Sequence, residues 1–401
     1  MKMQIIYLAV VFLVIIGLLA IRRPLYQAIL GGLIVTAFFY QIPPVEIGRR
    51  TTMVITKWSS LSVLLSLYLI TFLQRILESR SQIKLAQQDL DGIFHNRRIN
   101  TAGAALFIGL LPSAASMVLC SDIVKDATDG YLEPKDQAFV ASWFRHIPES
   151  TLPTYTGVLL MLTLSGVPIS QFLMGMIVPI IVLVVLGYLP YLRRLPKNPG
   201  TPGSDSRAKD VMHLFQHLWS LLLILVLILG FGLSVVSSVL MSIVASILAY
   251  HVGTAELLPM FRSAFERKML INTFLVLVLK EFIDYTGVLE LLPEAMATLP
   301  LQTYLVFALM FFVATAISGT TGAIAMGTPL AFAAIPGGMP LMVYLMCICH
   351  AASQVSPTHI CLVIAADYFN VTLGELIRKT LPMSLLFCIL MTIYYNILLI
   401  I

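Results

Sequence analysis

Long apolar stretches separated by short polar breaks run along the whole chain. A bilayer needs about 20 predominantly apolar residues for each helical crossing, and the pattern supplies this length many times. The weak alternation of membrane barrel strands is not present in it. The pattern therefore predicts an all-α polytopic membrane protein with about ten transmembrane helices. We place them near residues 4–21, 25–43, 56–77, 138–166, 169–191, 211–231, 233–250, 268–288, 341–367 and 380–401.

Two further apolar segments, near residues 101–123 and 303–334, are interrupted in their middles. The first contains Pro112 between apolar and small polar residues, and the second contains Gly319 and Gly322 between hydroxyl residues. Unwound backbone cannot face lipid, because each unsatisfied amide or carbonyl costs several kcal/mol there. We therefore predict that both segments are re-entrant hairpins, which enter the membrane and return to the same side.

A polar stretch at residues 192–210, rich in Pro, Gly and Ser, divides the chain near its middle and predicts a flexible cytoplasmic linker. The flanking parts, 1–191 and 211–401, show the same order of crossings, hairpin and Pro-broken crossing, the last near 138–166 and 341–367. The second part enters from the opposite side, so the order predicts an inverted-topology repeat. With an offset of 204, residues of the two parts coincide at His146 and His350, Pro153 and Pro357, Thr154 and Thr358, and Ser116 and Thr320.

Composition and charge agree with this topology. Apolar residues make up 59% and charged residues 11% of the chain, against about 45–50% and 25% in soluble domains. The net charge of +5 follows from loop charges on one side of the membrane, so nucleic acid is not an expected partner. The positive-inside rule predicts that both termini lie outside. Of 25 basic residues, nineteen then lie inside: Arg22, Arg23, Arg75, Arg80, Lys84, Arg97, Arg98, Lys125, Lys135, Arg193, Arg194, Lys197, Arg207, Lys209, Arg262, Arg267, Lys268, Arg378 and Lys379.

The two hairpin tips offer polar groups at membrane depth. Helix N-termini carry about half a positive charge and free N–H groups, which suit a carboxylate. Hydroxyls and freed carbonyls suit a hard cation such as Na⁺. The alternative is that small polar residues only allow close helix packing. From the tips we predict substrate binding by Ser113, Ser116, Ser318, Thr320 and Thr321, and ion binding near Pro112 and Gly319.

The Pro-broken crossings carry ionisable residues inside a membrane span, which are functional candidates by default. Arg145 could bind a substrate carboxylate through its fork of donors, or pair with Glu149 at i, i+4, and the two readings are compatible. Proton coupling would need a titrating group such as Glu149 or a histidine, whereas Na⁺ coupling would not. From the breaks we predict substrate binding by Arg145, His146 and Thr358, and ion binding or coupling by Glu149, Ser150, Thr151, Gln354 and Ser356.

Three motifs resemble those of the ion transporter superfamily, which includes citrate, dicarboxylate, gluconate and arsenite permeases. They are Leu110-Leu111-Pro112, Trp143-Phe144-Arg145-His146 and Ser356-Pro357-Thr358-His359-Ile360-Cys361-Leu362. Within that superfamily they are most similar to a prokaryotic membrane family labelled as a domain of unknown function. The tip after Leu111-Pro112 departs from the expected Gly-rich pattern. The resemblance implies a location in the prokaryotic inner membrane. It also implies a homodimer in which a transport domain moves against a scaffold, in an elevator-like shift.

Together these features predict a secondary active transporter of a small organic anion, coupled to Na⁺ or H⁺. An ion channel and an intramembrane enzyme are the alternatives. Metalloprotease and serine-protease motifs are missing, His146 and Glu149 have no further ligand at metal spacing, and no P-loop indicates ATP. Beyond Na⁺ as a coupling ion we predict no cofactor and no metal. The five cysteines have no C-x-x-C spacing and read as buried thiols.

Overall fold

The structure, a computed structural model, describes residues 2–21, 23–110, 115–198, 206–297 and 300–400. Every regular element in these ranges is helical. The first part contains α1 (Lys2–Ala20), α2 (Leu25–Phe39), α3 (Pro44–Thr56), α4 (Trp58–Ser79), α5 (Gln82–Phe94), α6 (Arg97–Ile108), α7 (Ala115–Thr128), α8 (Pro134–His146), α9 (Thr156–Ser165), α10 (Ile169–Gly175), α11 (Ile177–Tyr188) and the 3-10 turns η1 (Pro148–Ser150) and η2 (Leu192–Arg194).

The second part begins at Arg207. It contains α12 (Arg207–Leu229), α13 (Val235–Ala249), α14 (Thr254–Ser263), α15 (Arg267–Thr286), η3 (Val288–Leu291), α16 (Leu292–Ala297), α17 (Thr303–Ser318), α18 (Thr320–Ala334), α19 (Gly338–Ser353), α20 (Ile360–Tyr368) and α21 (Leu373–Leu398). The first arms of the two interrupted segments are α6 and α17, and the second arms are α7 and α18.

Four described helices are long and apolar enough to cross a membrane: α4, the continuous stretch of α10 and α11, α12 and α21. The shorter helices α1, α2, α9, α13, α17 and α19 are also apolar. Apart from α17, which is the first arm of the second predicted hairpin, these helices overlap the predicted crossings. The prediction of an all-α, multi-pass membrane protein is confirmed, whereas the membrane orientation of each helix stays a prediction.

The two parts of the chain pack against each other in a reciprocal way. Helix α2 packs on α15 while α13 packs on α4, and the amphipathic α3 and α14 lie against α15 and α4 respectively. Farther along, α18 packs on α9 and α7 on α20. Such an exchange of equivalent contacts is what a two-fold relation between the halves produces. It agrees with the predicted repeat, although its inverted orientation in a membrane stays a prediction.

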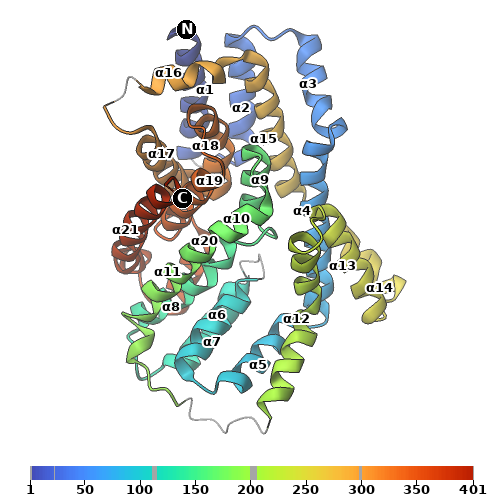
Figure 1. Cartoon of the computed structure of the whole chain (residues 1–401), viewed down its shortest axis with the longest axis vertical. Coiled ribbons are helices and arrows are strands. Elements are labelled where there is room, and N and C mark those ends of the chain that lie inside the picture. The colour runs from blue at the N-terminus through green and yellow to red at the C-terminus, as the bar shows by residue number, and fades with distance from the viewer. Residues whose placement is uncertain (1, 22, 111–114, 199–205, 298–299, 401) are drawn as a thin grey trace.

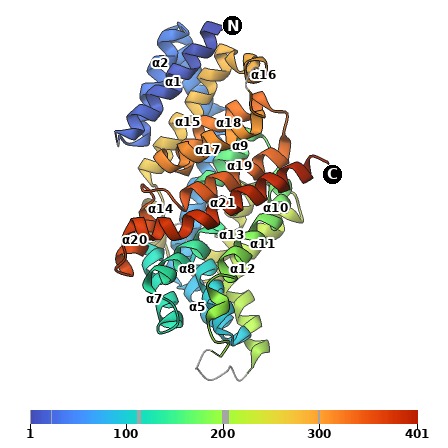
Figure 2. The same cartoon turned by 90° about the vertical axis from the view of Figure 1, so that its left-hand side faces the viewer.

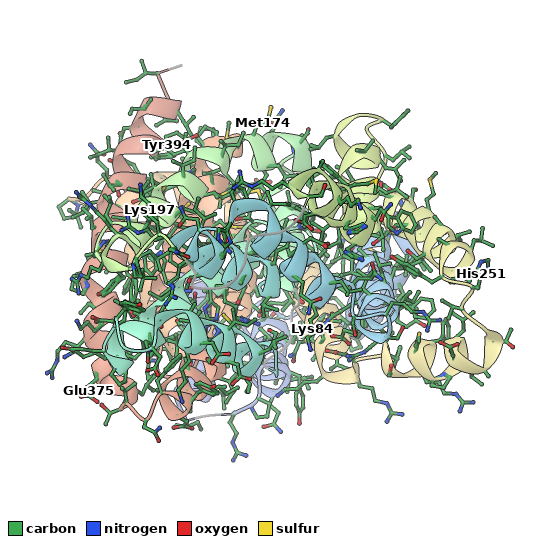
Figure 3. All side chains as sticks on the ribbon, turned by 90° about the horizontal axis from the view of Figure 1, so that it is seen from below. Lys84, Met174, Lys197, His251, Glu375 and Tyr394 are labelled. Carbon is green, nitrogen blue, oxygen red and sulfur yellow. The ribbon has the colours of Figure 1, made fainter. Side chains whose placement is uncertain are left out.

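Helices α1, α2, α3 and α15 form one end of the molecule, and the chain passes along α4 to α5, α6, α7 and α12 at the other (Figure 1). Helix α21 runs obliquely over the face seen in Figure 2. Seen from below, Glu375 and Tyr394 lie near the two ends of α21 on one flank, and His251 lies on the opposite flank beside α14 (Figure 3). The hairpin arms and broken crossings lie between these flanks.

Helix α8 is buried on every side from Asp136 to His146, although much of it is polar. Such a helix needs internal partners for its polar groups, because an uncompensated buried charge is strongly destabilising. The Asp136 carboxylate lies 2.7 Å from Lys379 Nζ and 3.6 Å from an Arg194 nitrogen. The Trp143 indole donates to the Leu183 carbonyl at 2.8 Å. These contacts fix α8 against α11 and α21, and thereby fix the residue at its end, Arg145.

Three amphipathic helices, α3, α5 and α14, were not anticipated. Their mixed polar sequences fall between the apolar runs, so a search for membrane crossings passes over them. The described start of the predicted linker is also structured, since Leu195 and Lys197 offer their carbonyls to the Arg98 side chain and the Arg97 amide of α6. Residues 199–205 lie outside the described ranges.

Candidate functional site

Three interruptions in helix meet in the middle of the molecule. Helix α8 ends at His146 and α9 begins at Thr156, while α19 ends at Ser353 and α20 begins at Ile360. The arms α17 and α18 meet at Gly319, whose φ of 79° lies in the left-handed region that favours glycine. The predicted breaks are therefore at the predicted places in these three segments.

A cavity of about 380 Å³ lies where these breaks face α4 and α15. Its outer wall is formed by Leu67, Ile70, Thr71 and Gln74 of α4 together with Glu266 and Met269 at the start of α15. Its inner wall consists of Arg145, Glu149, Thr154, Tyr155, Thr156, Gly157, Thr320, Thr321, His359, Ile360 and Cys361. The cavity thus separates two long helices from the hairpin tip and the broken crossings.

Three helix N-termini point their first residues at this cavity. They belong to α9, α18 and α20, and they supply Thr156, Thr320 and Ile360 to its lining. The N-cap residues of these helices make no side-chain capping hydrogen bond. The first amides of a helix have no partner within it, and each N-terminus is equivalent to roughly half a positive charge. Three such ends at one cavity create a site that attracts anions.

Arg145 lies at the inner end of the cavity with its side chain 2% exposed. Its guanidinium donates to the Ser116 hydroxyl at 2.9 and 3.2 Å, and one nitrogen lies 3.5 Å from Cys361 Sγ. Glu149 Oε2 lies 3.6 Å from the same guanidinium nitrogen, which is the predicted i, i+4 pair. The Glu149 side chain is 28% exposed, so this ion pair faces the cavity from one side.

In each half a hydroxyl from the broken crossing holds the first arm of the hairpin. The Tyr155 hydroxyl donates to the Gly109 carbonyl at 2.5 Å, and the Ser356 hydroxyl donates to the Ala316 carbonyl at 2.8 Å. Both carbonyls lie next to the end of an arm, α6 in one half and α17 in the other. Hairpin and broken crossing therefore form one connected unit in each half.

The predicted residues divide into those that line the cavity and those that lie behind it. Arg145, Glu149, Thr320 and Thr321 line it, while Ser116 holds Arg145 from behind. The Ser318 hydroxyl donates to the Ala314 carbonyl of its own helix. Pro112 and Ser113 lie outside the described residues, and Gly319 forms the tip between α17 and α18.

The remaining predicted residues are used in local hydrogen bonds. Ser150 and Thr151 both donate to the Ile147 carbonyl, and Thr358 shares a hydrogen bond of 2.9 Å with Ser356. Gln354 is fully buried and its Oε1 lies 3.3 Å from the Ser142 hydroxyl. The assignment of ion binding to these residues stays a prediction.

His146 is 1% exposed, and its Nδ1 lies 2.6 Å from the Ser142 carbonyl. Its ring stands edge-on to the ring of His359, with 4.7 Å between the centroids. The possible ligand atoms of His146, His359 and Cys361 all lie within 4.8 Å of one another. This group could hold a metal ion, and its members come from both halves of the chain.

Several cavity residues were not selected from the sequence. Thr71 and Gln74 belong to a crossing whose pattern shows only an apolar face. The sequence around them gives no indication that they line a cavity. Tyr155 and Thr156 follow the Pro-rich break directly, so their position was available from the sequence. Cys361 was classed as a buried thiol, and only the fold brings it beside Arg145.

Comparisons with known proteins place the chain in a family. A family model described as a protein of unknown function, DUF401, matches residues 5–398. The chain belongs to this family. Its fold is similar to that in the crystal structure of the Alcanivorax borkumensis YdaH transporter, with a TM-score of 0.58, 14% identity and 89% of each chain covered. A search of curated proteins finds no match. Membership of the DUF401 family confirms part of the resemblance, and the wider superfamily stays a prediction.

Proposed function

We propose that this protein is a secondary active transporter of a small organic anion carrying a carboxylate, coupled to Na⁺ or H⁺. The observation that carries the proposal is the convergence of three uncapped helix N-termini on one cavity beside Arg145. Broken helices whose N-termini face the substrate are the usual anion sites of secondary transporters. The similarity in fold to a solved transporter agrees with this role.

The charges around the cavity favour one anion and one cation. Arg145 and the helix ends attract a carboxylate, whereas Glu149 and Glu266 bring negative charge to the same space. A carboxylate bound between Arg145 and Thr320 would accept hydrogen bonds from the guanidinium. It would therefore compete with Glu149, which now faces the same group. Glu149 would then need another positive partner, which a proton or Na⁺ would supply. This exchange is a physical reason for substrate and ion to bind together.

The cavity volume of about 380 Å³ lies near the lower end of the roughly 300–1,000 Å³ that small-molecule sites occupy. We therefore propose a compact substrate. In the proposed mechanism α4 and α15 belong to a scaffold, and the hairpins with α8, α9, α19 and α20 move against it as an elevator. A homodimer formed through the scaffold is part of the same proposal.

The test is uptake of labelled carboxylates by proteoliposomes that contain the purified protein, under an imposed Na⁺ gradient or pH gradient. Candidate substrates come from a thermal-shift screen with and without Na⁺, since a ligand of the folded state raises the unfolding temperature. Saturable uptake driven by one gradient is the expected result. A steady ion current without saturable uptake would contradict the proposal and favour a channel.

Two substitutions locate the site. Arg145→Lys keeps the charge but loses the paired donors, which removes a charge-assisted hydrogen bond of about 1.5–3 kcal/mol and raises KM by roughly 10- to 150-fold. Thr320→Val removes one hydroxyl at constant shape and is also expected to raise KM. Arg49→Lys and Thr52→Val, on the exposed side of α3, are the matched controls and leave uptake unchanged. Normal uptake by both cavity variants would place the substrate elsewhere.

A further inference from the structure

In the cluster of His146, His359 and Cys361, one ring nitrogen of His146 is oriented to bind a metal. The Ser142 carbonyl can only accept a hydrogen bond, so Nδ1 of His146 carries the proton and Nε2 presents its lone pair. That Nε2 is buried and has no hydrogen-bond partner among the described residues. Metal-binding histidines are typically oriented by a backbone carbonyl in this way.

A carboxylate lies beside the cluster and would supply a fourth ligand after its side chain rotates toward the other three. Glu149 Oε2 lies 3.7 Å from His146 Nε2, and its side chain extends into the cavity. The Cys361 sulfur lies 3.5 Å from the Arg145 guanidinium, and a bound metal ion would hold this buried cysteine as the thiolate. A thiolate and a carboxylate together would balance the charge of a divalent cation. Two imidazoles, a thiolate and a carboxylate form a ligand set suited to zinc or cobalt.

The separation of these atoms is close to that in a metal-bound site. Bond lengths of about 2.0–2.3 Å in a tetrahedral site place ligand atoms roughly 3.3–3.8 Å apart. The three ligand atoms here lie within 4.8 Å of one another. Side-chain rotations that move these atoms by about 1 Å would therefore close the site.

We propose that His146, His359 and Cys361, with Glu149, form a binding site for a divalent transition metal of the zinc class. His146 and Glu149 come from the break in the first half, and His359 and Cys361 from the break in the second. A bound metal therefore joins the two broken crossings at the cavity. The proposal depends on these contacts alone and does not require the proposed transport of an organic anion.

The test is an anaerobic titration of the purified, metal-free full chain with Co²⁺, followed by absorbance. Binding of one Co²⁺ per chain with a thiolate-to-cobalt charge-transfer band is the expected result. Cys361→Ser removes that band and weakens binding by at least about 10- to 100-fold. Cys388→Ser, a change of a half-buried thiol in α21, is the matched control and keeps the band.

A second pair of histidines is the alternative metal site whose use would contradict the proposal. His213 and His217, one helical turn apart on α12, have ring centroids 6.3 Å apart and could bind a metal adventitiously. If His217→Gln abolishes Co²⁺ binding while Cys361→Ser leaves it intact, the proposal is overturned. A titration that shows no stoichiometric binding overturns it as well. His359→Asn, checked for folding by its unfolding midpoint, must weaken binding without loss of folded protein.

Discussion

Gly109→Ala tests whether the hairpin arm α6 sets the position of Arg145. A Cβ atom at Gly109 would lie 2.2 Å from the Arg145 carbonyl oxygen and 3.1 Å from its carbonyl carbon. Both atoms belong to the backbone of α8, so no side-chain rotation relieves the contact. The Gly109 carbonyl also accepts the Tyr155 hydroxyl. The substitution must therefore separate α6 from α8 or distort one of them.

The size of the effect follows from this distance. Ordinary contacts of a Cβ atom begin near 3.4 Å, so the two backbones must separate by about 1 Å. Overpacking of this kind costs about 1–3 kcal/mol of stability. A displacement of about 1 Å at a site that depends on orientation can reduce its rate by about 100-fold. We expect a lower unfolding midpoint together with a large loss of uptake.

The assay is uptake in proteoliposomes together with the unfolding midpoint of the purified variant. Gly48→Ala is the control, because a Cβ atom at Gly48 in α3 meets nothing within 4 Å. Alanine favours helix by about 1 kcal/mol over glycine, so this control keeps or slightly raises the midpoint. Uptake by Gly109→Ala at the level of wild type and Gly48→Ala would refute the proposed close packing of α6 and α8.

Three further substitutions have defined outcomes. Ser116→Ala removes the hydroxyl that holds the cavity arginine and raises the uptake KM with little change in unfolding midpoint. Lys57→Met leaves the largely buried Glu281 carboxylate without its nearest cation, lowering the free energy of unfolding by about 1–3 kcal/mol in denaturant titrations. A hydrogen bond from Lys135 lowers the pKa of exposed Glu133, so Glu133→Gln slightly lowers the unfolding midpoint at pH 7. That difference disappears as pH falls through the lowered pKa, as midpoints measured against pH will show.

The helices of this protein could be predicted because lipid imposes a simple rule. Crossings require long apolar runs, and breaks inside them require Pro, Gly or hydroxyl residues. Both features can therefore be recognised from the sequence. The tip at Gly319 and the break after His146 were located in this way. Amphipathic helices such as α3 and α14 were not, because burial of one face depends on a partner that the local pattern does not reveal.

The contacts in the site that join residues close in sequence could be predicted. The pairing of Arg145 with Glu149 follows from helical spacing, and Thr320 follows from the broken hairpin. The approach of Cys361 to Arg145 depends on packing between the two halves and has no signal along the sequence. No further metal ligand for His146 could be recognised from sequence spacing, whereas the fold brings His359 and Cys361 beside it.

A structure of the protein with a transported carboxylate bound would decide whether the cavity is the substrate site. The proposed function predicts carboxylate oxygens about 2.7–3.1 Å from the first backbone amides of α18 and from the Arg145 guanidinium. It also predicts that the carboxylate occupies the cavity between α4 and the inner wall. A substrate found outside this cavity, with Arg145 still bound only to protein groups, would contradict the proposed function.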